Sequence, residues 1–355
     1  MTYLDYQATT PLAPEALAAM MPWLAGDGFG NPHSPHRPGR AAAAAVEVAR
    51  EQVARLLPDG GRVIFTGGAT EALNLALTGN RAHRTAVSAI EHAAVLDTAQ
   101  WGTDVTLLPV REDGLVDPQI ALPDGVELVA VMQVNNEIGT IQPVERLAQR
   151  THDAGALFLC DAAQSFGKLQ IPAGPDLIAV SAHKICGPKG IGALWVRDGV
   201  SLAPLIHGGG QEQGLRSGTL SPALCAGFGA AAALAEARMA EDAAHVAALW
   251  EVARDILSGW TLNGSADERW HGNLNLRREG LDVARLMSEL RDIAFSAGSA
   301  CASGSGRPSH VLRALGLSDR QAKSSIRLGF GRYTAKDELA DACRRIDAAA
   351  CAQGI

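Results

Sequence analysis

Between residues 60 and 200 the chain alternates short apolar runs with amphipathic helical patterns, and no other feature constrains its fold as strongly. Seven runs have the length of strands, among them "RVIFT", "VELVAVMQ" and "DLIAVSAH". They are apolar almost throughout, which is typical of strands that are buried on both faces. Stretches such as "ATEALNLALTG" supply the helices between them. The pattern predicts an α/β fold with a mainly parallel, seven-stranded sheet covered by helices.

The C-terminal part of the chain has a different pattern. A long alanine-rich helical stretch follows "RSGTLSP" and leads into shorter strands and helices, which are typical of a small α+β layer. With 355 residues the chain is long enough for two domains. We predict a large domain at 12–240, and a small domain formed by 1–11 together with 241–355.

Charge and terminal sequence argue against several classes of partner. Lys and Arg number 31 against 38 Asp and Glu, a formal charge of −7, whereas a nucleic-acid binder needs a basic face or tail. The N-terminus lacks the basic and apolar regions of a signal peptide, and no uninterrupted apolar run approaches the roughly 18 residues that cross a bilayer. The six cysteines form no CxxC pair. We therefore expect a cytoplasmic protein without a nucleic-acid or membrane partner, whose thiols are mostly buried.

Polar side chains follow the strand-like runs, at the edge where open α/β sheets bind ligands. Gly67–Glu71 is a small-residue turn that enters a helix, and the N–H groups of such a turn suit a phosphate. The other runs are followed by a lysine, a carboxylate, an imidazole and amide donors: Lys184 with Ser181 and His183, Asp161 with Gln164, Glu91–His92, and Asn135–Glu137. Pyridoxal phosphate needs a lysine for its Schiff base, a carboxylate for its ring nitrogen and an anion site for its phosphate. The set of residues predicts a site for this cofactor.

Each of these groups has a more ordinary explanation when it is taken alone. The glycine turn is often only the start of a helix, and a single histidine such as His92 is more often a packing or surface residue. An aspartate after a strand often caps a turn, and a lysine is usually solvated. The chain also has no Walker A motif and no Rossmann GxGxxG after a strand. Only the occurrence of the whole set, in order and at one edge, favours the cofactor site.

Two further residues stand out, each with two interpretations. Cys301 lies in "FSAGSACASGSGRPSH", a run of small residues that predicts an accessible thiol on a loop, either catalytic or a surface thiol without a role. Arg327 lies among apolar residues of a predicted strand, where it needs an anion, either a substrate carboxylate or an ordinary ion-pair partner. His33 and His36 form a possible metal pair, but no carboxylate or thiol is spaced to complete it, so we predict no metal site.

Nine motifs, spread over nearly the whole chain, resemble those of the cysteine desulfurases of the NifS/IscS type. These enzymes belong to the class V aminotransferase family and have fold type I of the pyridoxal-phosphate enzymes. The motifs are "YLDYQATTP", "FTGGATEALNLAL", "EHAAVLDT", "VNNEIGTIQP", "DAAQSFGK", "SAHKICGPKGIGALWV", "HGGGQEQGLRSGT", "GSACASGS" and "SSIRLGFGR". The resemblance implies a homodimeric enzyme that converts L-cysteine to L-alanine and leaves a persulfide on its own cysteine.

The resemblance also implies a role for individual residues. Lys184 binds pyridoxal 5'-phosphate and later acts as the base at the substrate Cα, His92 stacks on the ring and moves protons, and Cys301 attacks the substrate sulfur. The remaining contacts are Asp161 to the ring nitrogen, Gln164 to the ring hydroxyl, Ala69, Thr70, Ser181 and His183 to the phosphate, Thr219 to the phosphate of the neighbouring subunit, and Asn136 and Arg327 to the substrate carboxylate.

The resemblance leaves the substrate and the sulfur acceptor open. Selenocysteine lyases and cysteine sulfinate desulfinases share the fold, and their reactions can proceed without a catalytic thiol. The acceptor implied is an Fe–S scaffold or another carrier protein.

Gln213 stands where relatives usually carry Arg, which predicts a changed charge at the dimer-facing rim and a tuning effect on activity.

Overall fold

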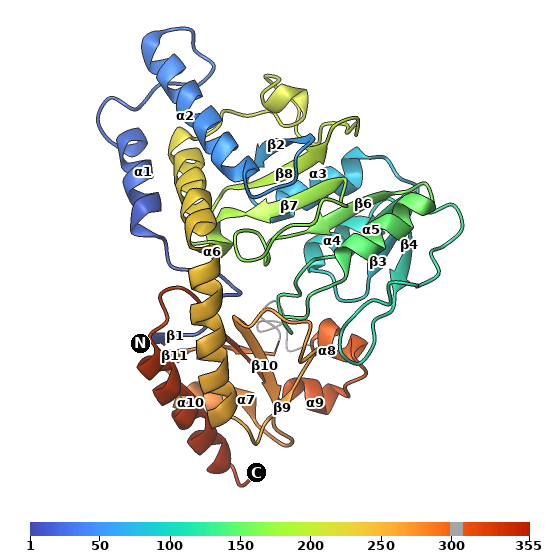
Figure 1. The fold of residues 1–355 in the computed structure, drawn as a ribbon, viewed down its shortest axis with the longest axis vertical. Helices are drawn as coiled ribbons and strands as arrows, with labels where there is room; N and C mark the ends of the chain where they lie inside the picture. The colour runs from blue at the N-terminus through green and yellow to red at the C-terminus, as the bar shows by residue number, and fades with distance from the viewer. Residues whose placement is uncertain (299–307) are drawn as a thin grey trace.

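The computed structural model describes residues 1–298 and 308–355, and the larger part of it is built around one sheet (Figure 1). Within these residues the sheet has seven strands, in the spatial order β2 (Gly61–Thr66), β8 (Gly192–Arg197), β7 (Leu177–Ser181), β6 (Leu157–Asp161), β5 (Leu128–Ala130), β3 (Arg84–Ser88) and β4 (Asp104–Leu108). β8 runs antiparallel to both of its neighbours, and all other neighbouring pairs are parallel. The predicted α/β class and mainly parallel sheet are confirmed.

Helices cover both faces of the sheet because its strands are apolar on both faces. In β6, for example, Phe158 and Cys160 belong to one core cluster and Leu159 to the other. The first cluster includes residues of α2 (Arg37–Ala54), α5 (Val144–Asp153) and α6 (Pro222–Ile256), and the second includes residues of α3 (Ala69–Gly79) and α4 (Ala93–Gln100). The carboxyl ends of β2, β3, β5, β6 and β7 lead into the loops that carry the predicted site residues.

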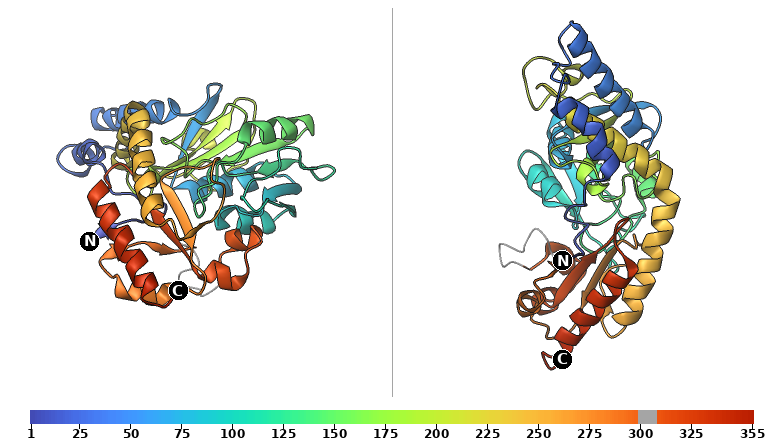
Figure 2. Two further views of the ribbon diagram at one scale, coloured as in Figure 1. Left: turned by 60° about the horizontal axis from the view of Figure 1, so that its bottom comes forward. Right: turned by 90° about the vertical axis from the view of Figure 1, so that its left-hand side faces the viewer.

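A smaller layer is built around an antiparallel sheet. Its strands lie in the order β12 (Ser296–Ala297), β13 (Ser325–Gly329), β10 (Asn273–Arg277) and β9 (Thr261–Leu262). Its helices are α7 (Val283–Glu289), α8 (His310–Ala314), α9 (Asp319–Lys323) and α10 (Lys336–Cys351). The N-terminal strand β1 (Thr2–Tyr3) pairs in parallel with β11 (Ile293–Ala294), so the chain begins beside its own C-terminal part (Figure 2).

The 35-residue helix α6 runs from the large sheet to the smaller layer (Figure 1). It packs against α1 (Pro14–Leu24) and α2 at one end and against α10 at the other. The predicted domain boundary at 240/241 falls inside this helix, and the boundaries stay predictions. By length and composition alone, α6 could also cross a membrane, a weak criterion that the core helix of a soluble protein meets equally well.

The described cysteines lie in the predicted elements. Cys160 lies in β6, Cys225 in α6 and Cys343 in α10, and all three are buried like small apolar residues. Cys351 is the exception among these cysteines to the expected burial of the thiols. It is exposed because it is the last residue of α10, where its Sγ accepts a hydrogen bond from Arg278 Nη2 at 3.4 Å.

Candidate active site

One large cavity, of about 910 Å³, opens at the carboxyl edge of the seven-stranded sheet. The structure brings together there ten of the residues that the sequence predicted for the site. They are Ala69, Thr70, His92, Asn136, Asp161, Gln164, Ser181, His183, Lys184 and Arg327. They come from the ends of five sheet strands and from β13 of the smaller layer, so both layers contribute to the cavity.

Lys184 lies in a short 3₁₀ turn, Ala182–Lys184, that directly follows β7. The strand stops at Ser181, and the turn directs the side chain. Its Nζ donates hydrogen bonds to the backbone oxygens of Gln7 and Ala8, the latter at 2.9 Å. The N-terminal segment that supplies these acceptors was quoted as a motif, but no site role was assigned to it.

Asp161 and Gln164 lie next to each other after β6. Asp161 is buried, and Oδ1 accepts a hydrogen bond from Ala163 N at 2.9 Å. Burial raises the pKa of Asp161, while the charges of His92 and Lys184 oppose that shift. Gln164 Nε2 donates to Gln7 O at 2.9 Å, and its buried Oε1 has no hydrogen-bond partner among the residues that the structure describes. This oxygen is suited to accept a hydrogen bond from a hydroxyl group in the cavity.

His92 is the N-cap of α4, and this position orients its ring. Nδ1 accepts a hydrogen bond from Ala94 N at 3.0 Å, so the neutral imidazole carries its proton on Nε2. His183 is neutral near pH 7, because burial and the neighbouring lysines lower its pKa to about 4. Its Nδ1 lies 3.1 Å from Thr9 Oγ1. A neutral histidine can give one hydrogen bond to a phosphate without adding a charge.

The phosphate end of the cavity is the turn between β2 and α3. Ala69 and Thr70 open the helix, where backbone N–H groups have no helical acceptor. Glu71 also lines the cavity, but its charge is paired: Arg216 Nε lies 2.7 Å from Oε1, and Oε2 accepts a hydrogen bond from Gly67 N at 2.7 Å. This turn can therefore bind an anion through its N–H groups and the positive end of the helix dipole.

Arg327 is fully buried in β13 and reaches the cavity from the smaller layer. Its Nη2 forms an ion pair with Asp5 Oδ1 at 2.7 Å, and its Nη1 donates to Asn136 O at 3.1 Å. The ion-pair alternative for this arginine is therefore present in the structure. Its Nε has no partner within the described residues and is a donor still available for a carboxylate. The substrate-binding roles of Arg327 and Asn136 stay predictions.

Two of the residues singled out from the sequence lie outside the cavity, and a third is not among the described residues. Thr219 is exposed and does not line the cavity of this single chain. Gln213 is exposed and has a left-handed backbone, with φ of +57° and ψ of 28°. Cys301 lies outside the described residues.

The residues of the cavity fit pyridoxal phosphate. A lysine, a buried carboxylate, an unsatisfied amide oxygen and a helix N-terminus are the groups that the amine link, ring nitrogen, ring hydroxyl and phosphate of this cofactor require. The residues missed by sequence reasoning are Gln7, Ala8 and Thr9, because their contribution is mainly through backbone oxygens.

Comparisons with known proteins agree on one family. The model of the family described as Aminotransferase class-V matches residues 2–341. A cysteine desulfurase IscS of Rickettsia bellii (strain OSU 85-389) is 43% identical over 95% of this chain and 88% of its own length. That of Rickettsia felis (strain ATCC VR-1525 / URRWXCal2) is 43% identical over 97% and 91%.

Solved structures show the same likeness. A NifS-like protein superposes with a TM-score of 0.90 and 30% identity and covers 100% of both chains. A structure titled "SspA in complex with cysteine" superposes with a TM-score of 0.83 and 36% identity, and covers 94% of this chain and 100% of its own.

Proposed function

The chain belongs to the class V aminotransferase family, and from this membership we propose that it is a cysteine desulfurase that uses pyridoxal phosphate. It converts L-cysteine to L-alanine and transfers the sulfur to one of its own cysteines. The observation that carries the proposal is the meeting of Lys184, Asp161, Gln164 and His92 in one cavity, although they come from the ends of three different strands. The curated relatives at 43% identity, which carry the name cysteine desulfurase IscS, support the same activity.

The residues that would hold the cofactor follow from the geometry. Lys184 provides the amine for the covalent link, Asp161 faces the ring nitrogen and Gln164 Oε1 accepts from the ring hydroxyl. Ala69, Thr70, Ser181 and His183 line the phosphate end. When bound, pyridoxal phosphate supplies an electron sink for the charge that develops at the substrate Cα.

The remaining residues bind substrate and move protons. Asn136 and Arg327 orient the substrate carboxylate, and the Nε of Arg327 is the donor that the Asp5 ion pair leaves for it. Lys184 takes the proton from Cα, and His92 transfers protons through Nε2. Both groups are held by backbone contacts, so they need little reorganisation when substrate binds.

Cys301 carries the sulfur-transfer step. Its thiolate attacks the sulfur of the bound cysteine, an S–S bond forms and the C–S bond breaks. The carbon fragment keeps the electron pair of the C–S bond, takes up a proton at Cβ and regains the Cα proton from Lys184 to become alanine, and Cys301 holds the persulfide. A reductant or an acceptor thiol then removes the outer sulfur and restores the thiol.

The test is alanine release from L-cysteine in the presence of a reductant, with Cys301→Ala measured beside the wild type. We expect alanine from the wild type and a loss of at least about 100-fold in the variant, because the nucleophile is missing. Alanine from both proteins would instead indicate a lyase that needs no thiol, such as one acting on selenocysteine or cysteine sulfinate. No alanine from either protein would reject cysteine as the substrate.

We propose a homodimer in the cytoplasm, in which Thr219 of each subunit contacts the cofactor phosphate of the other. The sulfur acceptor is a carrier or an Fe–S scaffold protein, in line with the IscS name of the relatives. A scaffold or carrier protein that becomes labelled by ³⁵S only when Cys301 is present would support this assignment.

A further inference from the structure

The turn at 135–139, which follows β5, has two sides. Asn136 lines the large cavity, whereas Glu137, the next residue, is not among the described residues that line it. The side chain of Glu137 is buried against the smaller layer instead, where its Oε2 accepts a hydrogen bond from the hydroxyl group of Ser309. One short turn therefore connects the predicted substrate site with the smaller layer.

The residues that Glu137 holds lie on either side of Cys301 in the sequence. Gly298 comes shortly before the cysteine and Ser309 shortly after it, while Cys301 itself lies outside the described residues. Asn275 Nδ2 donates hydrogen bonds to the backbone oxygen of Glu137 at 3.0 Å and to that of Gly298 at 3.3 Å. Ser309 is bound directly by the carboxyl group. Because each residue of a chain spans a limited distance, holding these two flanking residues limits where the thiol can lie.

Helix α8, which begins directly after Ser309, contacts the same part of the large sheet. Nε2 of its first residue, His310, lies 2.9 Å from the backbone oxygen of Glu91. Apolar side chains of α8 also form one buried cluster with Ile90 and Ile138, which come from the loops after β3 and β5. The start of α8 is therefore held against two loops that supply residues to the active site.

The turn itself is held by other groups than the Glu137 carboxyl group. Asn135 Oδ1 accepts a hydrogen bond from Glu137 N at 2.8 Å. The backbone oxygen of Asn136 accepts hydrogen bonds from Arg327 Nη1 and from Asn273 Nδ2, both at 3.1 Å. Truncation of the Glu137 side chain should therefore keep the substrate-binding side of the turn in place and release only the hydroxyl group that the carboxyl group binds.

We propose that Glu137 is a positioning residue for the sulfur-transfer step, which holds the residues flanking the Cys301 segment against the turn that carries Asn136. This inference rests on the proposed function, in which Cys301 attacks the sulfur of a substrate whose carboxylate Asn136 orients. Glu137 touches none of the reacting atoms. It sets the place of the nucleophile relative to the substrate, and a displacement of about 1 Å can cost roughly 100-fold in rate.

The test separates sulfur transfer from proton transfer at Cα. Rapid mixing with L-cysteine without reductant, followed by acid quenching and mass spectrometry, measures how fast the persulfide forms on Cys301. Exchange of the Cα hydrogen of L-alanine with solvent deuterium requires the cofactor and Lys184 but no thiol. We expect Glu137→Ala to slow persulfide formation by about 10- to 100-fold and to leave the alanine exchange within about twofold of the wild type.

Three further single variants and one double variant show whether the lost hydrogen bond is the cause. Glu137→Gln keeps an acceptor for the Ser309 hydroxyl group and should retain most of the wild-type rate. Ser309→Ala removes the same bond from the other side, so its effect and that of Glu137→Ala should not add in the double variant. Because Ser309 also caps α8, Ser318→Ala at the exposed N-cap of α9 is the matched control and should change neither rate.

Hydrogen–deuterium exchange of the protein gives a readout that needs no turnover. The amide groups of α8 should exchange faster in Glu137→Ala than in the wild type, because the start of the helix has lost a contact. Unchanged amide exchange would overturn the inference.

The kinetic results would overturn it in three ways. These are an unchanged rate of persulfide formation in Glu137→Ala, an equal loss in Glu137→Gln, and equal slowing of persulfide formation and alanine exchange. A wild type that forms no persulfide would instead reject the proposed function, and with it the role of Glu137, before any variant is compared.

Discussion

Glu91 is a buried carboxyl group that lies directly before His92. Its Oε1 accepts hydrogen bonds from the Ser88 hydroxyl and from Met132 N, the latter at 2.8 Å. Its Oε2 is buried without a partner among the described residues. Burial raises the pKa of Glu91 from 4.5 to about 8, and the charge of Asp161 adds to the shift. When Glu91 is protonated and neutral, Asp161 is the carboxylate of this pair that carries the negative charge expected opposite a pyridine nitrogen.

This residue predicts a specific pH dependence of stability. The pKa of Glu91 is higher in the folded than in the unfolded chain, so its contribution is fully present below about pH 4.5 and is lost as the pH rises towards 8. Glu91→Gln resembles the protonated form and should lack this loss. We expect the variant to gain stability relative to the wild type by about 1.4 kcal/mol for each pH unit between about pH 5.5 and about pH 7.5.

Urea unfolding at several pH values would measure this difference. Glu236→Gln, at an exposed position of α6, is the control and should follow the wild type. If Glu91→Gln and the wild type lost stability in parallel as the pH rises, Glu91 would not be protonated in the folded protein.

At the scale of elements, the contact between α2 and α6 is tight because it contains a glycine. A Cβ on Gly229 would lie 2.7 Å from Ala49 Cα and 2.3 Å from Gln52 Oε1. The first of these atoms belongs to a helix backbone that cannot move alone. The close approach fixes the direction of α6, which in turn connects the large sheet with the smaller layer.

Gly229→Ala should therefore destabilise the protein although alanine is the better helix former. We expect a net loss of about 1–3 kcal/mol, because overpacking outweighs the gain of about 1 kcal/mol from helix propensity. The matched variant is Gly227→Ala, whose Cβ would meet Met20 Cγ at 2.6 Å, in a side chain that can change rotamer. Its loss should be smaller. Chemical denaturation of both variants is the measurement, and a Gly229→Ala protein at least as stable as the wild type would contradict the close contact.

At the scale of the whole molecule, the cavity depends on distant parts of the chain and, in our proposal, on a second chain. Residues 7–9 line it from the N-terminal segment, and Arg327 enters it from the smaller layer. Thr219 lies outside the cavity of its own chain. If Thr219 reaches the neighbouring site, each subunit completes the site of the other.

Complementation between two inactive variants tests this arrangement. Thr219→Glu should abolish activity by placing a carboxylate beside the phosphate, and Lys184→Ala should abolish it by removing the amine. A purified heterodimer of the two has one site with both residues intact, so we expect roughly half of the wild-type alanine release. A heterodimer that forms but stays inactive would show that Thr219 acts within its own subunit.

The sequence by itself determined the sheet and the edge at which the site forms. Strands buried on both faces must be apolar throughout, and the polar residues that follow them must then gather at the carboxyl ends. These are local consequences of strand geometry, which is why Lys184, Asp161 and His92 could be predicted and were found lining one cavity. The reversed direction of β8 and the spatial order of the strands were not predicted.

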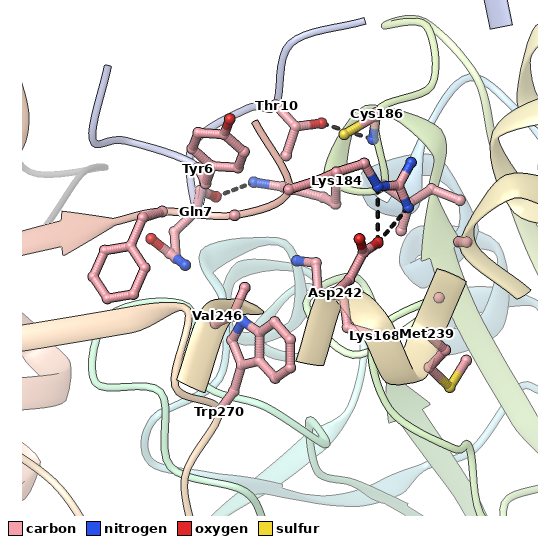
Figure 3. Close-up of a pocket in the computed structure, with 16 residues that line it drawn as sticks. Tyr6, Gln7, Thr10, Lys168, Lys184, Cys186, Met239, Asp242, Val246 and Trp270 are labelled. Atoms are coloured by element: carbon pink, nitrogen blue, oxygen red, sulfur yellow. Dashed lines mark hydrogen bonds and ion pairs between the residues drawn. The ribbon is translucent and has the colours of Figure 1, made fainter. Parts of the chain in front are cut away.

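Only the tertiary structure decided which distant groups meet. The backbone oxygens of Gln7 and Ala8 accept from Lys184, Asp5 neutralises Arg327, and Lys168 shares a second, smaller cavity with Lys184 (Figure 3). None of these contacts has a local sequence signal, because each depends on how the N-terminal segment, α6 and the smaller layer pack together. The hydrophobic pattern of the sequence indicates the periodicity of each helix or strand. Contacts between elements depend instead on how the side chains of those elements pack against one another.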